Sequence, residues 1–454
     1  MKIMEIEGGK ELSGTIRISG AKNATVALIP AAILTDEEAT ICNIPEITDT
    51  EALCEILKGL NVDVKRASES IIINPKNMKN MEITEEFSKK LRASYYFMGA
   101  LLGKYKKAVM YFPGGCSIGA RPVDLHLKGF EALGAKVTSE KNKYIVEAEE
   151  LHGANIYLDI ASVGATINIM LAAVKAKGKT IIDNAAKEPE IVNVATFLNN
   201  MGAKITGAGT STIKIEGVDY LHKCFHEVIP DRIEAGTYII IGALCGTPLK
   251  VDNVIPEHVD SLLSKLEEMG VELEIGQDYV IVSNQGNKRA TSIKTAVYPG
   301  FPTDLQQPFT VLQTQCNGKS KTTETIFENR FMHVPYLNDL GADITVKNQT
   351  ATIIGKSDLK GCQVVATDLR AGAAMVAAAL TAQGTTTITN IEHILRGYEN
   401  MVDKLTNVGA KILAELKSFF KLLLSFNSCS SEAIVMSFFE YWLFIMTDSF
   451  FFNI

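Results

Sequence analysis

The chain has 454 residues, 46% of them hydrophobic and 21% charged, which is enough apolar material for large cores and excludes disorder throughout. Its 45 basic and 52 acidic residues give a net charge of −7, so there is no overall attraction to nucleic acid or to an anionic membrane. Eight cysteines without a CxxC pair argue against a disulfide framework and the commoner zinc sites, and they favour a reducing, cytoplasmic location.

The N-terminal sequence, MKIMEIEGGKEL, is charged and contains no apolar run of about 7 to 15 residues. We therefore expect neither a signal peptide nor a membrane anchor at this end. The segment precedes the first apolar helix and reads as strand.

One signature recurs six times along the chain: the end of a helix, a turn residue and a strand, as in FEALGAKV and FLNNMGAKI. The spacing is close to 70 residues, which is too regular for unrelated turns. Glycine or asparagine at the turn favours the left-handed backbone that ends a helix before a strand. The six turn residues are Asn61, Gly134, Gly202, Gly270, Gly341 and Gly409.

Each repeat contains an amphipathic helix and a second helix that is almost wholly apolar, as in GAAMVAAALTAQG, and reads β-α-β-β-α-β. A second turn, marked by Asn43, Asn184, Asn253 and Asn390, follows a strand in four copies. Helices that are apolar all round must be buried, so we expect them inside, wrapped by strands and amphipathic helices.

Six units of about 70 residues are too many for one core, and a division into three plus three is expected. We predict one domain over residues 22–229, carrying the Cys116 loop, and a second domain formed by residues 1–21 together with 230–412. In this arrangement the N-terminal strand completes the last unit.

The residues that enter the six apolar helices share a register but differ in chemistry. Four of the six are basic, and a cation added to a helix N-terminus makes a strong receptor for phosphate or carboxylate, although a solvated surface charge is the alternative for each. Asp304, acidic where most copies are basic, is a candidate base or a helix N-cap. These positions are Lys22, Arg92, Ser162, Arg232, Asp304 and Arg370.

Two copies replace the asparagine turn, at residues 112–126 and 326–335, and such departures from a repeat often mark sites. In the first, Cys116 lies among glycines and close to Arg121, which is the setting of a reactive thiol; an incidental thiol is the alternative. His222, Cys224 and His226 alternate along a strand, but no fourth ligand is in view, so we predict no metal site there.

Residues 413–454 differ from the rest in composition, with nine of the 19 phenylalanines and the single tryptophan. Their most apolar stretch, 433–446, is shorter than the roughly 20 residues of a membrane-spanning helix, so we predict no membrane span. Three interpretations remain open: a surface-binding amphipathic element, an extra packed helix, or a read-through or frameshifted end.

Several motifs then resemble one family. These are SGAKNA (19–24), PGGCSIGARPVDLH (113–126), SVGAT (162–166), IPDRIEAGT (229–237), PGFPTD (299–304), ENRFMHVP (328–335), DLRA (368–371) and RGYE (396–399). Together they are similar to the enolpyruvyl transferases that act on UDP-N-acetylglucosamine, and the likeness runs to about Ile412. The resemblance implies a two-domain inside-out α/β barrel that closes over phosphoenolpyruvate and the nucleotide sugar, without a cofactor.

The resemblance also implies roles for individual residues. Phosphoenolpyruvate would be held by Lys22, Arg121 and Arg396, and Asn23 would lie between the substrates. Arg92 and Arg370 are further substrate-binding candidates because of their register at the helix starts. The uracil pocket would be formed by Arg121, Pro122, Val123, Asp124 and Leu125, the diphosphate site by Ser162, Val163 and Gly164, and the sugar site by Asp304 and Ile326.

In the implied chemistry, the sugar 3-hydroxyl adds to C2 of the enol, C3 is protonated by Cys116, and phosphate leaves. Asp304 would orient or deprotonate the hydroxyl, while Lys22 and Arg396 stabilise the charge that develops. Two alternatives remain: a silent paralogue that only binds the nucleotide sugar, and the sister enzyme that uses shikimate 3-phosphate. The oligomeric state is left open.

Overall fold

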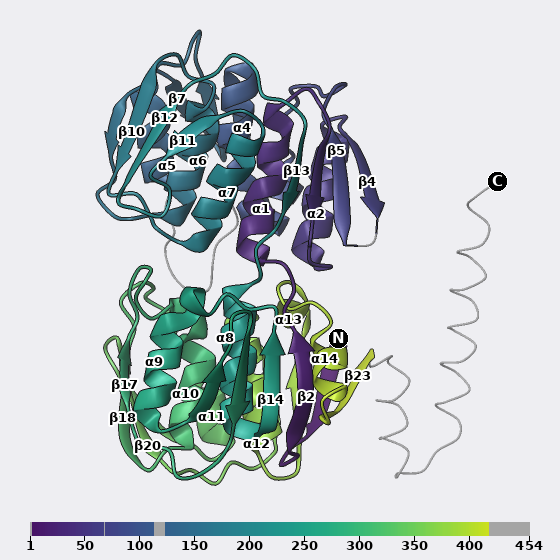
Figure 1. Ribbon diagram of the computed structural model, residues 1–454, viewed down its shortest axis with the longest axis vertical. Coiled ribbons are helices and arrows are strands. Elements are labelled where there is room, and N and C mark those ends of the chain that lie inside the picture. The colour runs from purple at the N-terminus through teal and green to yellow at the C-terminus, as the bar shows by residue number, and fades with distance from the viewer. Residues whose placement is uncertain (1, 68, 113–122, 417–454) are drawn as a thin grey trace, which may run out of the picture.

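The computed structural model describes residues 2–67, 69–112 and 123–416, which form two lobes stacked along the long axis of the molecule (Figure 1). Each lobe has its own apolar core. One core draws on buried residues between 21 and 228, and the other on residues 4–18 together with 233–410. The predicted residues Cys116, Arg121 and Pro122, and the chain beyond 416, lie outside the described residues.

Within the described residues, the upper lobe of Figure 1 contains three sheets and the first seven α-helices. Its strands are β3 (Ala39–Cys42), β4 (Asp63–Ala67), β5 (Ser70–Asn74), β6 (Lys107–Tyr111), β7 (Lys136–Glu140), β8 (Lys143–Glu147), β9 (Asn155–Tyr157), β10 (Lys179–Asp183), β11 (Lys204–Thr206), β12 (Thr212–Glu216) and β13 (Cys224–Glu227). Its helices are α1 (Lys22–Ala31), α2 (Thr48–Gly59), α3 (Glu85–Lys90), α4 (Tyr96–Tyr105), α5 (Asp124–Ala132), α6 (Val163–Ala173) and α7 (Pro189–Asn200), with 3-10 turns η1 (Ala32–Leu34) and η2 (Arg92–Tyr95).

The lower lobe is built in the same way. Its strands are β1 (Lys2–Glu7), β2 (Leu12–Arg17), β14 (Gly246–Asp252), β15 (Glu272–Ile275), β16 (Tyr279–Ser283), β17 (Ser292–Lys294), β18 (Gly318–Thr323), β19 (Asp343–Lys347), β20 (Thr350–Gly355), β21 (Gln363–Val365), β22 (Thr385–Thr389) and β23 (Lys411–Leu416). Its helices are α8 (Arg232–Cys245), α9 (Asp260–Met269), α10 (Gln306–Thr314), α11 (Val334–Asp339), α12 (Leu369–Thr381), α13 (Glu392–Leu395) and α14 (Met401–Thr406), with 3-10 turns η3 (Pro256–Val259) and η4 (Thr303–Leu305).

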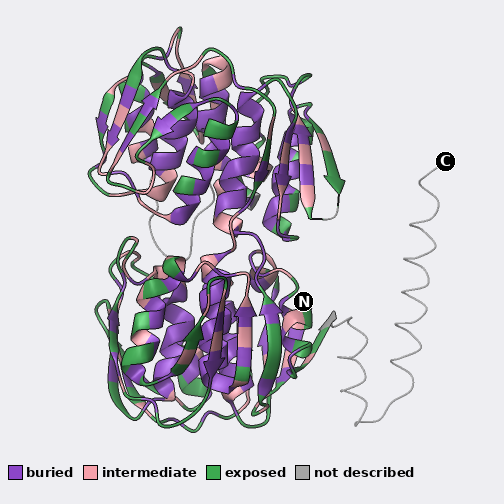
Figure 2. Cartoon of the chain, viewed as in Figure 1, coloured by how far each residue is buried: buried purple, intermediate pink, exposed green. Residues whose placement is uncertain are grey.

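The apolar helices occupy the inside of each lobe, as their composition predicts. In α12, every residue from Arg370 to Leu380 is buried, and α4 and α6 are buried almost as completely. Helices α4 and α6 pack against each other in the upper lobe, and α8, α10 and α12 do so in the lower lobe. Figure 2 shows this buried interior with exposed residues on the surrounding strands and outer helices. In the described part of the chain, no helix has the length and apolarity needed to cross a membrane.

The predicted left-handed turns are confirmed at all six positions of the repeat. The φ angles are 62° at Asn61 and between 81° and 109° at the five glycines. The second set of turns behaves alike, since Asn43, Asn184, Asn253 and Asn390 have φ between 55° and 59°. Both turn signatures therefore correspond to positions where the backbone itself requires glycine or asparagine.

The order of elements within a unit differs in one respect from the predicted β-α-β-β-α-β. In the third unit the chain runs β9, α6, β10, α7, β11 and β12, and these strands form one sheet in the order β11-β12-β10-β9. The strand that precedes the inner helix is short, only three residues in β9 and β17, and so it carries little alternation in the sequence. In the structure, one strand, β10, lies between the two helices α6 and α7, whereas two strands were predicted between the helices of a unit.

The chain crosses between the lobes twice, and each crossing exchanges a strand. Strand β2 precedes α1 but pairs in parallel with β14 of the lower lobe, whereas β13 precedes α8 but pairs in parallel with β3 of the upper lobe. Strand β1 lies between β22 and β23. Strand β23 extends to Leu416, so residues 413–416 belong to the sheet and not to the tail that composition places after residue 412.

Close packing of α4 against α6 yields a first prediction. A Cβ at Gly99 would lie 2.3 Å from the carbonyl oxygen of Asn168, and the Gly99 N–H donates to the Asn168 side chain over 2.8 Å. We expect Gly99→Ala to destabilise the fold by about 2 to 3 kcal/mol, because backbone must move. Gly59, at the end of α2, has open space around it, so Gly59→Ala should be neutral or stabilising by up to ~1 kcal/mol. Denaturant unfolding tests both; equal stabilities for the two variants would contradict this packing.

Candidate active site

Two cations from different lobes meet on one buried carboxylate. Lys22, the first residue of α1, places its Nζ 3.0 Å from Asp49 Oδ2, and Arg396, which follows α13, places its Nε 3.1 Å from Asp49 Oδ1. The Asp49 side chain is 6% exposed and stands in the first turn of α2, where a negative charge also suits the helix dipole. The contact joins the two lobes directly at the position predicted for a dianionic substrate.

Opposing effects act on the pKa of Asp49. Burial alone would raise it, but Lys22 and then Arg396 outweigh this and bring the pKa below its ordinary value of 3.8. Asp49 is therefore the internal counter-ion of two cations. Without it, both cations would have to hold an anion from solution or face each other unshielded.

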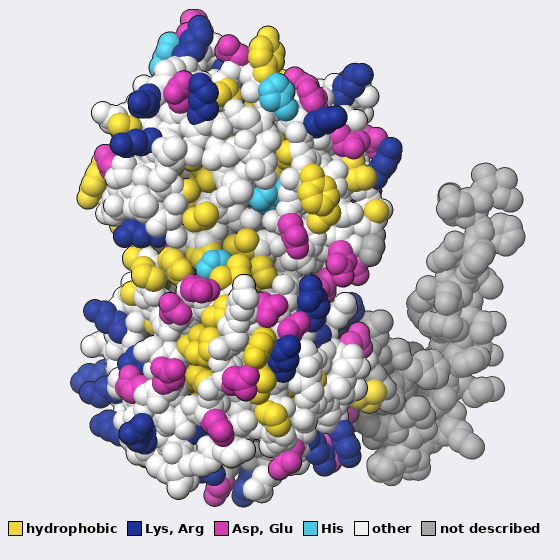
Figure 3. All heavy atoms as spheres, in the orientation of Figure 1, with side chains coloured by type: hydrophobic (Ala, Val, Ile, Leu, Met, Phe, Trp, Pro, Cys, Tyr) yellow, Lys and Arg dark blue, Asp and Glu magenta, His cyan; other side chains and the backbone are white. Residues whose placement is uncertain are grey.

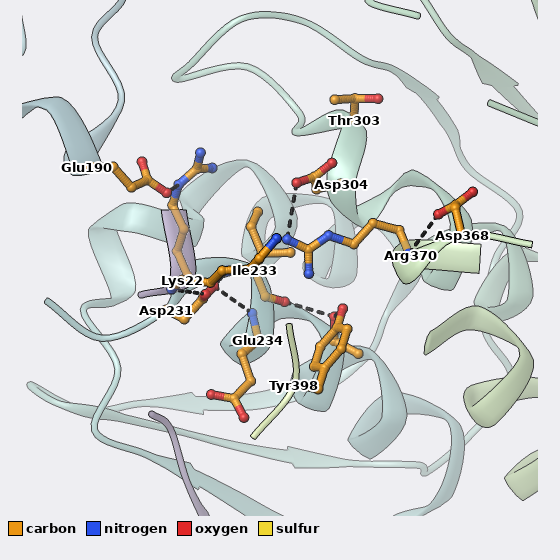
Figure 4. A network of polar contacts seen from close by, with 12 residues as sticks. Lys22, Glu190, Asp231, Ile233, Glu234, Thr303, Asp304, Asp368, Arg370 and Tyr398 are labelled. Carbon is orange, nitrogen blue, oxygen red and sulfur yellow. Dashed lines mark hydrogen bonds and ion pairs between the residues drawn. The ribbon is translucent and has the colours of Figure 1, made fainter. Parts of the chain in front are cut away.

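A second acid lies between two arginines in the lower lobe. Asp304, in the 3-10 turn before α10, forms an ion pair through Oδ1 with Arg330, and its Oδ2 lies 3.2 Å from Nη2 of Arg370. Both guanidinium groups are almost completely buried, whereas 26% of the Asp304 side chain remains exposed. Figure 4 shows the carboxyl group of Asp304 turned toward Arg370.

Asp304 is therefore not an N-cap, which was one of its two predicted roles. The N-cap position of this turn is Pro302, and no side chain caps it. In the neighbouring unit the capping role falls to Asp368, whose carboxylate accepts the backbone N–H groups of Arg370 and Ala371. The Asp304 carboxylate therefore lies just before α10, where it pairs with two arginines and caps no helix.

Aromatic and polar residues hold this second cluster in place. The Arg370 guanidinium lies over the ring of Tyr398, 5.4 Å from its centre, and the Tyr398 hydroxyl is 3.0 Å from the hydroxyl of Thr237. Burial opposes the charge on Arg370, but Tyr398 and Asp304 together raise its pKa above the ordinary value. Arg370 therefore remains a cation in a buried setting.

Ile326, predicted to face the sugar, is tied to Asp304 through a buried acid. The carboxylate of Glu324 accepts the backbone N–H of Ile326 over 2.8 Å and the hydroxyl of Thr303 over 2.9 Å. Thr303 is the residue before Asp304. The segment around Ile326 and the turn that carries Asp304 are thereby fixed relative to each other.

A third group of predicted residues lies in the upper lobe, where α5 and α6 begin. Ser162 caps α6 by accepting the Ala165 N–H, so the helix start has the form expected of an anion site. A Cβ at Gly164 would lie 3.0 Å from the Tyr95 hydroxyl and 3.1 Å from Nε2 of His126, which accounts for glycine there. Val123, which is buried, directly precedes α5, and Asp124 and Leu125 are the first two residues of that helix.

His126 is a neutral, fixed part of this region. Burial, with a contribution from Arg92, lowers its pKa from 6.5 to about 3. Its Nδ1 is 2.9 Å from the amide nitrogen of Asn168, which also donates to the backbone carbonyl of Tyr95. A neutral ring that accepts at Nδ1 carries its proton on Nε2, which lies beside Gly164. Arg92 thus belongs to this upper group in the structure.

The positions of the remaining predicted residues say less about their roles. Asn23 is half-buried in α1 directly after Lys22, and Val163 is the first residue of α6. Arg232, at the start of α8, is bound by Glu190 of the upper lobe with its Nε 3.0 Å from Oε1. The His222, Cys224 and His226 pattern gives no metal site among the described residues, and His226 contacts the side chains of Asn193 and Asn200 instead.

Several residues of the site were not identified from the sequence. Asp49, Arg330, Asp231 and Tyr398 all contact a predicted site residue. Arg330, Asp231 and Tyr398 lie within motifs that carry the family resemblance, which was a usable signal. Asp49 lies outside those motifs, and its partners are 27 residues before it and 347 residues after it in the chain.

The match to a family model decides the family. The model of EPSP synthase (3-phosphoshikimate 1-carboxyvinyltransferase) matches residues 6–405. The chain belongs to this family. It is 55% identical over 415 residues to UDP-N-acetylglucosamine 1-carboxyvinyltransferase 2 of Geobacillus kaustophilus, covering 91% of this chain and 97% of the relative. The protein of the same name from Listeria monocytogenes is 53% identical, over 90% of this chain and 96% of the relative.

Solved structures of enolpyruvyl transferases share the fold. The enolpyruvyl transferase NikO from Streptomyces tendae superposes with a TM-score of 0.84 at 26% identity, covering 91% of this chain and 99% of NikO. The EPSP synthase from Acinetobacter baumannii gives a TM-score of 0.71 at 16% identity, over 92% of this chain and all of that chain, which supports the fold alone. The predicted two-domain α/β architecture of an enolpyruvyl transferase is confirmed.

The pairing of Asp49 leads to a prediction about stability and pH. Asp49→Asn leaves two cations without their counter-ion, so we expect a loss of about 2 to 4 kcal/mol at pH 7. Because the folded pKa lies below the unfolded one, this stabilisation is complete above pH 3.8 and is lost as the pH falls through the lowered pKa. Unfolding at pH 7 and pH 2.5 should show the difference between variant and parent shrinking.

The control is Asp63→Asn, which removes an exposed acid 3.9 Å from Lys65. It should change stability by less than about 0.5 kcal/mol at either pH. A difference for Asp49→Asn that stays constant down to pH 2.5 would contradict the ion-pair explanation.

Proposed function

We propose that this transferase moves the enolpyruvyl group of phosphoenolpyruvate to the 3-hydroxyl of UDP-N-acetylglucosamine and releases phosphate, in the cytoplasm, as a step of peptidoglycan precursor synthesis. The observation that carries the proposal is the convergence of Lys22 and Arg396, from opposite lobes, on one buried carboxylate. The names of relatives at 53% and 55% identity support the choice of acceptor.

Phosphoenolpyruvate carries a carboxylate and a phosphate and needs several cations at once. Lys22 and Arg396 would exchange part of their contact with Asp49 for this ligand, and Arg121 would join them. Arg370 is buried and charged in the lower lobe, and Figure 4 shows it in the same polar network as Lys22 and Asp231. An anion bound between the lobes would draw them together, because each lobe contributes part of the charge.

The acceptor would extend from the upper lobe toward Asp304. Its uracil would lie against Arg121, Pro122, Val123, Asp124 and Leu125, and its diphosphate at the start of α6, where Ser162, Val163 and Gly164 present backbone N–H groups. The sugar would then face Asp304 and Ile326. Asp304 lies between Arg330 and Arg370, and its carboxylate would either orient the 3-hydroxyl by accepting its hydrogen bond or take up its proton.

The reaction proceeds by addition and elimination. The sugar oxygen bonds to C2 of the enol while C3 gains a proton, for which Cys116 is the proposed donor, and the hydroxyl proton passes to Asp304 or to solvent. The intermediate then loses a proton from C3 and breaks the bond from C2 to the phosphate oxygen, which restores the double bond. Lys22, Arg121 and Arg396 stabilise the phosphate as it leaves, and the scheme needs no metal and no redox cofactor.

Phosphate release from phosphoenolpyruvate tests the proposal. We expect turnover with UDP-N-acetylglucosamine and none with shikimate 3-phosphate; the reverse would assign the sister activity, and no turnover with either would leave a binding protein. Asp304→Asn and Cys116→Ala should each lower turnover by at least about 100-fold. Asp343→Asn, on the exposed strand β19, and Cys362→Ala, on the lower lobe, are the matched controls and should retain parental turnover. Full activity of Cys116→Ala would remove its role as acid.

A further inference from the structure

Asp231 is a buried carboxylate at the second crossing between the lobes, directly before α8. Its Oδ1 accepts the backbone N–H groups of Ile233 over 2.8 Å and Glu234 over 3.0 Å, as an N-cap does. Its Oδ2 accepts the backbone N–H of Lys22 over 2.9 Å. One carboxylate therefore binds the N-terminal ends of two helices, α8 of the lower lobe and α1 of the upper lobe (Figure 4).

This double role sets Asp231 apart from the other caps of the inner helices. Asp368 caps α12, and Ser162 caps α6, each through N–H groups of its own helix. The N-cap position of α1 is Ala21, whose side chain cannot cap. Asp231 thus supplies from the lower lobe the acceptor that α1 lacks, and it does so at Lys22 itself.

The backbone around Asp231 is held as firmly as its side chain. The two crossing segments pair with each other: the Ala21 N–H donates to Ile229 over 2.7 Å, and the Asp231 N–H donates to Ser19 over 2.9 Å. Between them, Gly20 pairs with Pro230, and a Cβ at Gly20 would lie 1.7 Å from the carbonyl oxygen of Asn43. The crossing is a short, tightly packed ribbon in which Asp231 is buried.

The other contacts between the lobes that surround Lys22 are of a different kind. Arg396 reaches Asp49 through a side chain that is 42% exposed, and Glu399 accepts the backbone N–H of Glu46 at an exposed position. Long, partly solvated side chains can part and re-form at little cost, whereas a buried cap shared by two helices cannot. The buried ion pair of Arg232, the next residue, with Glu190 of the upper lobe lies at the same crossing. Movement between the lobes is therefore easiest if it turns about this crossing, at Asp231.

We infer that Asp231 is a positioning residue: it fixes the start of α1, and with it Lys22, to α8, and it is the pivot about which the lobes close. The inference rests on the proposed function, since it concerns the cation that would hold phosphoenolpyruvate. During closure, Lys22 keeps its place relative to α8 and the lower lobe, while Arg396 and Asp49 change partners.

Asp231→Asn separates the two roles. Asparagine is as good an N-cap as aspartate, so its oxygen can stay on the two N–H groups of α8. Its NH₂ then faces the Lys22 N–H, donor against donor, and only the bond between the lobes is lost. Asp231→Ala removes both. Hydrogen–deuterium exchange at single-residue resolution, read on the substrate-free protein, reports each bond separately.

In Asp231→Asn we expect exchange at the Lys22 amide to rise about tenfold, the equivalent of one hydrogen bond, with less than about threefold change at Ile233 and Glu234. In Asp231→Ala, all three amides should exchange faster. With both substrates, Asp231→Asn should raise KM for phosphoenolpyruvate about tenfold and leave KM for the nucleotide sugar within about twofold. Thr84→Ala, which removes the cap of α3, controls for the loss of an ordinary cap and should change neither KM.

The outcomes separate this inference from the proposed function. Unchanged exchange at Lys22, or equal changes at Lys22 and Glu234 in Asp231→Asn, would overturn the inference whatever the enzyme does. Faster exchange at Lys22 with an unchanged KM for phosphoenolpyruvate would overturn the positioning role. If the parent protein shows no enolpyruvyl transfer, the proposed function fails, and the exchange experiment still decides whether Asp231 joins the lobes.

Discussion

The structure depends on buried acids that neutralise cations gathered for a ligand. A site for a small dianion needs several positive groups within a few ångströms, and in the empty protein those groups repel one another and lose hydration. Asp49 lies between Lys22 and Arg396, Asp304 lies between Arg330 and Arg370, and Glu190 binds Arg232. Figure 3 shows acidic and basic side chains side by side near the waist of the molecule. The cations are thus kept in position, and an incoming anion competes with carboxylates that are already there.

Much of the fold could be predicted because each unit repeats its own local signals. A left-handed turn leaves glycine or asparagine in the sequence, and an inner helix leaves an unbroken apolar run, so six copies reinforce each other. The register at Lys22, Arg232 and Arg370 likewise identified helix starts correctly. The three-residue strands before the inner helices left no such trace, and the order of elements within the unit was accordingly misjudged.

The candidate site was only half visible in the sequence for a related reason. Periodicity describes what happens within a unit, whereas the decisive pairs join different units. Asp49 belongs to the first repeat and Arg396 to the last, and nothing in the spacing of either residue indicates the other. Asp304 was singled out because it is acidic where most of the equivalent positions are basic. Its ion-pair partners, and the fact that it caps no helix, depend on how α10 and α12 pack against each other. Arg330 and Tyr398 lie inside motifs that carry the family resemblance, but the sequence analysis gave neither residue a role.

The exchange of β2 and β13 between the lobes has a consequence for the architecture as a whole. The chain enters and leaves the upper lobe through two neighbouring segments, and the Asp231 N–H donates to the backbone carbonyl of Ser19 between them. A direct peptide link from one crossing segment to the other would excise that lobe and leave every strand of the lower sheets with its partner. The larger molecule therefore resembles one three-unit body into which another has been inserted, at a point where the insertion costs neither body a strand.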